Sequence, residues 1–232
     1  MILPCVDVDP YAASRCGMEY TVRSLYLDTR TLDFYHEKLA GIKERKNIRI
    51  RGYNEITPET PIFLEIKRKT GLGATKRRSM VRYRDLSGFL EAGDARQSVL
   101  PIPGREEAVT NAEQFLFHVR SQALVPVITI VYEREAYFSK FDPGVRVTFD
   151  KNLRSHNDAS LDSLARELPE IPALPHRFVL EIKTDNMVTA WLASVVSRFG
   201  VNRDAASKYT LGIDALDAAG YRLDLIHRWT AP

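Results

Sequence analysis

Hydrophobic and polar residues alternate along seven segments of the chain, which is the pattern of β-strands. Residues i and i+2 of a strand share a face, so each segment is predicted to present one apolar face and one polar face. The predicted strands are residues 20–28, 47–53, 62–69, 76–84, 126–138, 144–150 and 177–184.

Five stretches between these strands have the composition and spacing of helices. The predicted helices are residues 31–39, 85–92, 106–122, 160–167 and 187–199. No Gly/Ser-rich linker or low-complexity tract divides the sequence, so we expect one domain over residues 1–232. Many strands with a few helices predict an α+β fold with an antiparallel sheet.

The polar faces of these strands are unusually rich in charge. In the segment IRIRGY, Ile48 and Ile50 lie on one face, whereas Arg49 and Arg51 lie on the other. The tetrapeptide LEIK occurs twice, and each copy presents a glutamate and a lysine on one face. The charged faces carry Arg49, Arg51, Glu65, Lys67, Lys69, Arg134, Arg146, Asp150, Glu181 and Lys183.

Two arrangements are compatible with these faces. One is an ordinary sheet whose charged face is solvated. The other is an antiparallel β-barrel with a charged lumen and with its apolar face covered by helices. Solvated faces usually include Ser, Thr, Gln and Asn, whereas these consist almost entirely of Arg, Lys and Glu, which favours the barrel. Like charges in a lumen require a polyanion to neutralise them, and Glu65 and Glu181 could hold a divalent cation that bridges phosphate oxygens.

The overall composition says little about the strand faces and more about where the protein is located. The 33 Lys and Arg residues and 30 Asp and Glu residues give a net charge of +3, which hides the charged strand faces. Two cysteines fit a reducing compartment. The longest apolar run, residues 123–132, is too short to cross a bilayer, and the N-terminus lacks the pattern of a signal peptide. We therefore expect a soluble, cytoplasmic protein.

Several of these segments resemble the VTC-type polyphosphate polymerase domain, a member of the triphosphate tunnel metalloenzymes, which also include the CYTH-type triphosphatases. The resemblance covers residues 20–209. It is carried by RSLYLDTRTLDF, IRIRGY, FLEIKRK, YEREAYF, RVTFDKNL, FVLEIKT and SKY, in that order.

The resemblance implies a tunnel of eight antiparallel strands that binds ATP or another triphosphate together with polyphosphate. It implies Mn²⁺ or Mg²⁺ as the cofactor and transfer of the γ-phosphoryl group of ATP to a growing polyphosphate chain. It further implies that Glu181 and Glu65 hold the metal and that Arg134, Lys208 and Tyr132 are catalytic. The implied phosphate-binding residues are Arg49, Arg51, Lys67, Lys76, Arg78, Arg134, Lys183, Ser207 and Lys208.

One departure from the family pattern concerns the N-terminus. Members of the family open with a strand that carries a Glu-x-Lys motif, and the residues before Tyr20 contain no such motif. We therefore expect the usual first strand to be missing. A tunnel without this strand leaves two alternatives to a polymerase, namely a triphosphate or polyphosphate hydrolase and a non-catalytic polyphosphate-binding or nucleotide-binding module.

A nucleic-acid-binding module is a further alternative. Eight basic residues and no acidic ones lie between Lys67 and Arg84, and such a hairpin could follow a phosphate backbone. Glu65 and Glu181 on the basic faces would repel nucleic acid, so no nucleic-acid partner is expected. A membrane-associated partner is compatible with the resemblance, and the sequence does not predict an oligomeric state.

Overall fold

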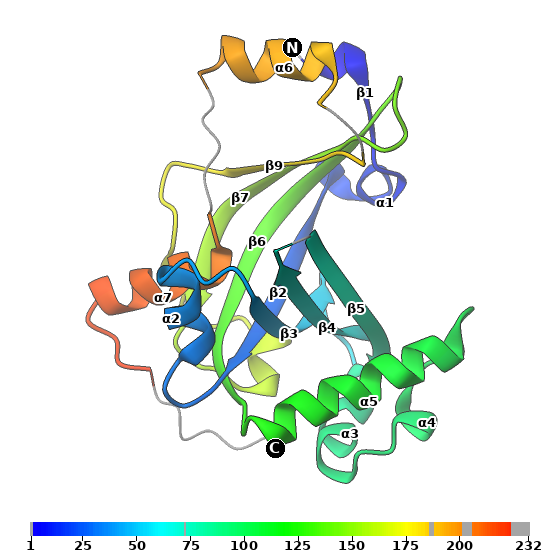
Figure 1. Cartoon of the computed structure of the whole chain (residues 1–232), viewed down its shortest axis with the longest axis vertical. Helices are drawn as coiled ribbons and strands as arrows, with labels where there is room; N and C mark the ends of the chain where they lie inside the picture. Colours follow the sequence, from blue (N-terminus) through cyan, green and yellow to red (C-terminus); the bar gives the residue numbers. More distant parts are fainter. Residues whose placement is uncertain (1, 72, 186–187, 201–205, 224–232) are drawn as a thin grey trace.

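The computed structural model of the chain describes residues 2–71, 73–185, 188–200 and 206–223. Within these ranges, nine strands form one antiparallel sheet with helices arranged around it (Figure 1). The strands are β1 (Val6–Val8), β2 (Glu19–Asp28), β3 (Arg45–Tyr53), β4 (Pro61–Thr70), β5 (Gly73–Arg82), β6 (Val125–Ser139), β7 (Arg146–His156), β8 (Ile171–Pro172) and β9 (Val179–Lys183). The predicted α+β class is confirmed, and each predicted strand is present.

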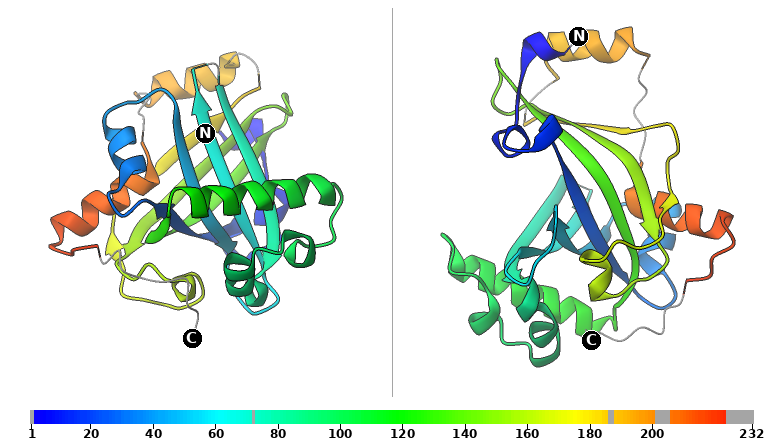
Figure 2. Two further views of the ribbon diagram at one scale, coloured as in Figure 1. Left: turned by 60° about the horizontal axis from the view of Figure 1, so that its bottom comes forward. Right: turned by 180° about the vertical axis from the view of Figure 1, so that it is seen from behind.

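The sheet is strongly curved and open (Figure 2). Its order is β5-β4-β3-β2-β6-β7-β8, with β1 paired to β6 and β9 paired to β7. In the part of the chain that the structure describes, β5 pairs with no strand except β4, and β8 and β9 pair only with β7. The predicted closed barrel is therefore corrected to an open sheet that encloses its inner face by curvature.

The N-terminal residues, which lack the Glu-x-Lys motif, contain one short strand. Val6–Val8 forms β1, a short strand that pairs antiparallel with the end of β6. It carries Asp7 between two valines and brings no lysine into the sheet. The described N-terminal residues therefore add a short strand to the sheet without adding a basic residue to it.

The helices agree with the prediction less closely than the strands do. They are α1 (Pro10–Ala13), α2 (Asp33–Leu39), α3 (Leu86–Ala92), α4 (Ala95–Ser98), α5 (Arg105–Ser121), α6 (Ala190–Arg198) and α7 (Lys208–Ala218). The segment predicted as a helix at 160–167 contains only a 3-10 turn, Leu161–Leu164. The helix predicted at 187–199 is α6, although Met187 lies outside the described residues. No sequence pattern predicted α7.

The outer face of β2–β5 carries the main hydrophobic core. Leu25, Ile50 and Leu64 point to this face because they alternate with the charged residues, and each is at most 1% exposed. Helix α5 crosses this face and buries Phe115 completely (Figure 2, left). Burial of each large aliphatic or aromatic side chain contributes about 1.5–3 kcal/mol. The covering helices therefore leave the charged residues on the opposite, inner face.

Helix α7 packs on the part of the inner face that β6 forms. Its residues Ile213 and Leu216 join the hydrophobic cluster that contains Ile128 and Ile130 of β6. Gly212 permits this close approach, because a Cβ atom there would lie 2.2 Å from Cδ1 of Ile130. The inner face therefore has two parts. Helix α7 covers the apolar part, and the charged part lies next to Lys208, the first residue of that helix.

Candidate functional site

The strand register brings opposite charges together on the inner face. On β3 and β4, Arg49 lies directly opposite Glu65, and Glu65 in turn lies opposite Arg78 of β5. On β6 and β7, Arg134 lies opposite Asp150. Directly opposite residues have Cβ atoms about 5 Å apart, so side chains of opposite charge can meet. The register therefore produces two charge clusters, one around Glu65 and one around Asp150.

In the Glu65 cluster, four cations surround one buried carboxylate. Oε2 of Glu65 lies 2.7 Å from Nη2 of Arg49 and 3.7 Å from Nη1 of Arg51. Oε1 lies 2.6 Å from Nζ of Lys76 and 3.3 Å from Nε of Arg78. Burial alone would raise the pKa of Glu65, but Arg49, Arg51 and Lys76 outweigh it and hold that pKa well below its usual range. Glu65 is therefore ionised and orients the four cations.

This geometry does not fit Glu65 as a metal ligand. Both of its oxygens contact cations, and its side chain is only 2% exposed. A divalent cation would have to displace or approach four positive groups. The assignment of Glu65 to the metal stays a prediction, and in this structure its carboxylate pairs with the basic side chains around it.

In the Asp150 cluster, one arginine and one lysine form ion pairs with a completely buried carboxylate. Arg134 donates from Nε to Oδ1 at 2.6 Å and from Nη2 to Oδ2 at 2.8 Å. Nζ of Lys208, at the start of α7, lies 2.7 Å from Oδ2. Burial alone would lower the pKa of Lys208, but Tyr132 and Asp150 outweigh it and the pKa is raised. Arg134 and Lys208 are therefore charged and fixed in position.

Tyr132 connects the two clusters. Its hydroxyl oxygen accepts hydrogen bonds from Nη2 of Arg51 at 3.4 Å and from Nη2 of Arg134 at 3.3 Å. The ring is 1% exposed, and Nζ of Lys208 lies 5.1 Å from its centroid. Among the three residues expected to be catalytic, Tyr132 therefore contacts both of the others and is covered by them.

Glu181 and Lys183 lie on β9, at the other edge of the curved sheet. Oε2 of Glu181 lies 3.7 Å from Nη2 of Arg134, and Oε1 lies 3.5 Å from Nζ of Lys183. Burial alone would raise the pKa of Glu181, but Lys183, Lys208 and Arg134 outweigh it and lower the pKa. The shorter of these contacts is 3.5 Å, against 2.6 Å for the shortest contacts of Glu65 and Asp150, and 36% of the Glu181 side chain is exposed. Glu181 is therefore the inner-face carboxylate with room for another partner.

Lys67 of β4 faces β9 across the curved sheet. Burial lowers the pKa of Lys67, and the charge of Glu181 partly offsets this effect. Lys183 also acts on Lys67 as a like charge. The curvature therefore brings residues from strands that are far apart in the sheet order into one electrostatic environment.

Ser207 lies immediately before α7. Its Oγ accepts a hydrogen bond from the backbone N–H of Thr210 at 3.5 Å, and its carbonyl accepts one from the Thr210 hydroxyl at 3.0 Å. These contacts are those of a helix N-cap. Ser207 is therefore engaged in starting the helix that positions Lys208.

Asp28 is a buried residue that sequence reasoning missed. At the end of β2, it accepts backbone N–H groups from Phe34 and Tyr35 of α2 at 3.0 Å each and the hydroxyl of Tyr209 at 2.6 Å. Asp28 thus ties α2 and α7 to the sheet and positions the residue next to Lys208. The only sequence signal was an aspartate at a strand end shortly before a helix, a position where Asp commonly accepts backbone N–H groups.

Replacing Tyr209 by phenylalanine is expected to lower the free energy of unfolding by about 1.5–3 kcal/mol, the range for a hydrogen bond to a charged group. The hydroxyl is the donor to Asp28, and the ring is only 3% exposed. Urea denaturation measures the difference, with the exposed Tyr221→Phe as the matched control. Equal stability of the two variants would show that the Tyr209–Asp28 bond does not hold α7.

The inner face carries a surplus of positive charge. Of the expected site residues in the described part of the chain, eight are cations and two are carboxylates, and the structure adds Asp150 as a third carboxylate, which leaves five positive charges unbalanced. The cations are Arg49, Arg51, Lys67, Lys76, Arg78, Arg134, Lys183 and Lys208. A ligand with several negative charges would balance this surplus.

Among the carboxylates Glu65, Asp150 and Glu181, Glu181 has the most exposed side chain. No group of three or more His, Cys, Asp or Glu side chains in the described residues could hold a metal on its own. Mg²⁺ is commonly bound by one or two carboxylates together with phosphate oxygens and water. The exposed, loosely paired carboxylate of Glu181 suits such a site, whereas the enclosed carboxylates of Glu65 and Asp150 do not.

The helices within the described residues include none that is both long enough and apolar enough to span a bilayer.

Comparison with known protein families gives a match to the VTC domain over residues 1–217. Subunit 2 of the Saccharomyces cerevisiae vacuolar transporter chaperone complex is 26% identical over 167 residues, which covers 64% of this chain and 19% of that protein. Subunit 4 of the Schizosaccharomyces pombe complex is 25% identical over 239 residues, which covers 84% of this chain and 32% of that protein. The chain therefore spans about a fifth to a third of the length of the curated relatives it matches.

Solved structures also share similarity with the chain. A Bacillus halodurans protein is 12% identical, with a TM-score of 0.45 and coverage of 85% of this chain and 83% of that protein. A Pyrococcus horikoshii protein is 14% identical, with a TM-score of 0.39 and coverage of 90% and 88%.

Proposed function

The chain belongs to the VTC domain family, and on this premise we propose that it is a metal-dependent polyphosphate polymerase. In this reaction, a terminal oxygen of polyphosphate attacks the γ-phosphorus of ATP. The bond between that phosphorus and the bridging oxygen of ADP breaks, and ADP leaves. The products are ADP and a polyphosphate chain longer by one phosphate.

The observation that carries this proposal is the surplus of cations on a sheltered, concave face. Phosphoryl transfer requires positioned positive charge on the phosphate oxygens more than it requires a covalent catalyst. Arg51 and Arg134 both donate to the hydroxyl of Tyr132, so the Glu65 and Asp150 clusters are adjacent. Consecutive phosphates of one chain could therefore contact cations of both clusters.

The residues have distinct proposed roles. Arg49, Arg51, Lys76 and Arg78 would bind one stretch of phosphates, while Arg134 and Lys208 would bind the phosphates at the reacting end. Tyr132 would position Arg51 of the Glu65 cluster and Arg134 of the Asp150 cluster. Lys67, Lys183 and the N-terminus of α7 at Ser207 would complete the basic surface. Glu181 would hold Mn²⁺ or Mg²⁺, which supplies charge neutralisation on phosphate oxygens.

The test is incubation of the protein with ATP and Mn²⁺ or Mg²⁺, with the products separated. The proposal predicts ADP together with long-chain polyphosphate. Free phosphate without polyphosphate would instead assign the face to hydrolysis of triphosphate or polyphosphate. Tripolyphosphate binding without either product would make the chain a non-catalytic polyphosphate-binding or nucleotide-binding module.

Replacing Glu181 by glutamine is expected to abolish metal-dependent turnover, at least a hundredfold, because it removes the carboxylate best suited to hold the metal. Folding should be retained, since the side chain is partly exposed and makes only long ion pairs. Activity is measured across a Mn²⁺ titration, with the exposed Glu113→Gln on α5 as the matched control. A Glu181→Gln protein with the metal dependence of the wild type would remove Glu181 from the metal site.

We also propose that the chain acts on the cytoplasmic side beside a membrane-associated partner. The supporting fact is that its relatives are subunits of vacuolar transporter chaperone complexes. Co-purification from detergent-solubilised membranes, compared with the soluble fraction, tests this association. Recovery in the soluble fraction alone would contradict it.

A further inference from the structure

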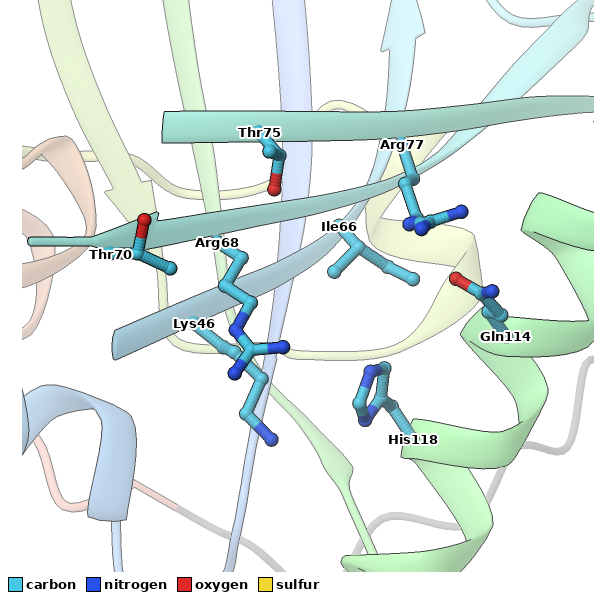
Figure 3. Close-up of a pocket in the computed structure, with 8 residues that line it drawn as sticks. All are labelled: Lys46, Ile66, Arg68, Thr70, Thr75, Arg77, Gln114 and His118. Atoms are coloured by element: carbon cyan, nitrogen blue, oxygen red, sulfur yellow. The ribbon is translucent and has the colours of Figure 1, made fainter. Parts of the chain in front are cut away.

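A second basic site lies on the outer face of the sheet, away from the charged inner face. A pocket of about 430 Å³ opens between the β4–β5 hairpin and α5 (Figure 3). Lys46, Arg68 and Arg77 extend from three adjacent strands into the pocket, which Gln114 and His118 of α5 also line. Small-molecule sites in proteins commonly have volumes of about 300–1,000 Å³, so the pocket is large enough for a small ligand.

Strand alternation explains why these cations leave the inner face. In the basic hairpin, Lys67 and Lys76 point inward, whereas Arg68 and Arg77 point outward because each lies one residue further along its strand. On the outward side, Lys46 lies directly opposite Arg68. Like charges at directly opposite positions destabilise a sheet. The hairpin therefore forms two basic surfaces, only one of which belongs to the proposed polyphosphate site.

The two surfaces differ in how their charges are balanced. On the inner face, Glu65 neutralises its neighbours, whereas none of the residues that line the outer pocket is acidic. Among the residues that the structure describes, no carboxylate forms an ion pair with Lys46, Arg68 or Arg77. The charge of Lys46 acts on Glu37 of α2 without an ion pair between them. The outer cations therefore repel one another with no carboxylate among them.

Neutral groups make the remaining contacts of these side chains. Nζ of Lys46 donates to Oε1 of Gln122 at 3.4 Å, and Nη1 of Arg77 donates to Oδ1 of Asn111 at 3.4 Å. The Gln122 amide donates to Nδ1 of His118 at 3.0 Å, which leaves the imidazole proton on Nε2. These long, neutral hydrogen bonds leave most of the donor capacity of the pocket available to a ligand.

From this placement we propose that the pocket is a second anion-binding site for a small ligand that carries more than one phosphate group. Two guanidinium groups and an ammonium group in one pocket match the charge and geometry of adjacent phosphates. The hydroxyls of Thr70 and Thr75 add neutral donors at its rim. The site is distinct from the proposed polyphosphate site because its residues lie on the opposite face of β4 and β5.

The test uses His118 as a reporter inside the pocket. Protein containing ¹⁵N-histidine is titrated at constant pH and ionic strength, and the His118 ring signals are assigned by their absence in His118→Asn. Tripolyphosphate represents a free inorganic anion, and glucose 1,6-bisphosphate represents an organic phosphate ester. Sulfate serves as the control for general anion effects. We expect one or both phosphate ligands to shift the His118 signals to saturation, whereas sulfate should not.

The double variant Arg68→Gln, Arg77→Gln is expected to weaken this binding at least tenfold for each guanidinium lost. Calorimetric binding of tripolyphosphate to the inner face should persist in this variant, since Arg68 and Arg77 do not contact that face. The matched control Arg15→Gln, Arg198→Gln removes two exposed arginines, one just after α1 and one at the end of α6. It should leave the His118 titration unchanged.

Three results would overturn the proposal. The first is a His118 signal that does not move with either phosphate ligand at millimolar concentration. The second is an unchanged titration in the Arg68→Gln, Arg77→Gln variant. The third is a response to an RNA oligonucleotide but to neither small phosphate, which would assign the outer surface to nucleic acid. None of these results depends on whether the inner face binds or elongates polyphosphate.

Discussion

Replacing Asp150 by asparagine is expected to lower the free energy of unfolding by about 3–5 kcal/mol, the range for breaking a buried ion pair by removing one partner. Asp150 is completely buried and is held by Arg134 and Lys208, whose side chains are 11% and 14% exposed. The amide would remove the short ion pairs of both buried cations and leave Arg134 only its 3.7 Å contact with Glu181. Urea denaturation at neutral pH measures the change.

The matched control is Asp7→Asn. Asp7 contacts Lys140 at 3.5 Å, but its side chain is 71% exposed, so its loss should change stability by less than about 0.5 kcal/mol.

Burial alone would raise the pKa of Asp150, and Arg134 and Lys208 more than offset this, so the folded pKa is lowered. The stabilisation by Asp150 should therefore be complete above its unfolded pKa of about 3.9 and be lost as the pH falls through the lower folded pKa. A loss of less than 1 kcal/mol in the Asp150→Asn variant, relative to the wild type, would contradict the inference that Asp150 stabilises the fold by binding Arg134 and Lys208.

Replacing Glu65 by glutamine is expected to destabilise the free protein by about 3 kcal/mol, near the lower end of the same range. Arg49 and Arg51 would lose a buried counter-charge, whereas Lys76 and Arg78 are more than one third exposed and would be rehydrated. Tripolyphosphate should then raise the unfolding temperature of this variant more than that of the wild type, because the ligand replaces the missing negative charge. Thermal unfolding with and without tripolyphosphate measures both effects.

This experiment separates the two roles that Glu65 could have. If Glu65 organises the cations, its replacement should increase the stabilisation by tripolyphosphate in the absence of divalent metal and keep the additional stabilisation by Mn²⁺. If Glu65 holds the metal, replacement should leave metal-free binding unchanged and eliminate the additional stabilisation by Mn²⁺. A variant stabilised by tripolyphosphate no more than the wild type would contradict the organising role. The exposed Glu113→Gln serves as the control for a change of one charge on the outside of the protein.

Strand alternation predicted the two faces of the sheet from the sequence alone. Ile48 and Ile50 lie in the outer core, and Arg49 and Arg51 lie on the inner face, as the period of two requires. This rule is local, so it holds whatever the tertiary arrangement of the strands. It could not predict that the sheet remains open, because closure depends on pairing between strands that are far apart in the sequence.

The missed helix α7 illustrates a second limit. Its inward side includes Gly212, which carries no side chain, so the apolar stripe is interrupted in the sequence. The glycine is there because the helix approaches Ile130, a reason that only the packing reveals. The position of Lys208 beside Asp150 was therefore hidden, although the residue itself was expected in the site.

The role of Glu65 marks a third limit. A glutamate on a basic strand face has the same sequence signature whether it binds a metal or orients arginines. The register places Arg49 and Arg78 on either side of it, which supports the organising role. Asp28 escaped notice for a similar reason, because its partner Tyr209 is distant in the sequence.

The most direct measurement of the central claim is a crystal structure of the protein grown with tripolyphosphate and Mn²⁺. We expect phosphates on the inner face, within hydrogen-bond distance of Arg51 and Arg134 and between the Glu65 and Asp150 clusters. We expect Mn²⁺ at Glu181 and none near Glu65. An inner face without phosphate, in a crystal where tripolyphosphate is bound elsewhere, would contradict the claim that this face is the polyphosphate site.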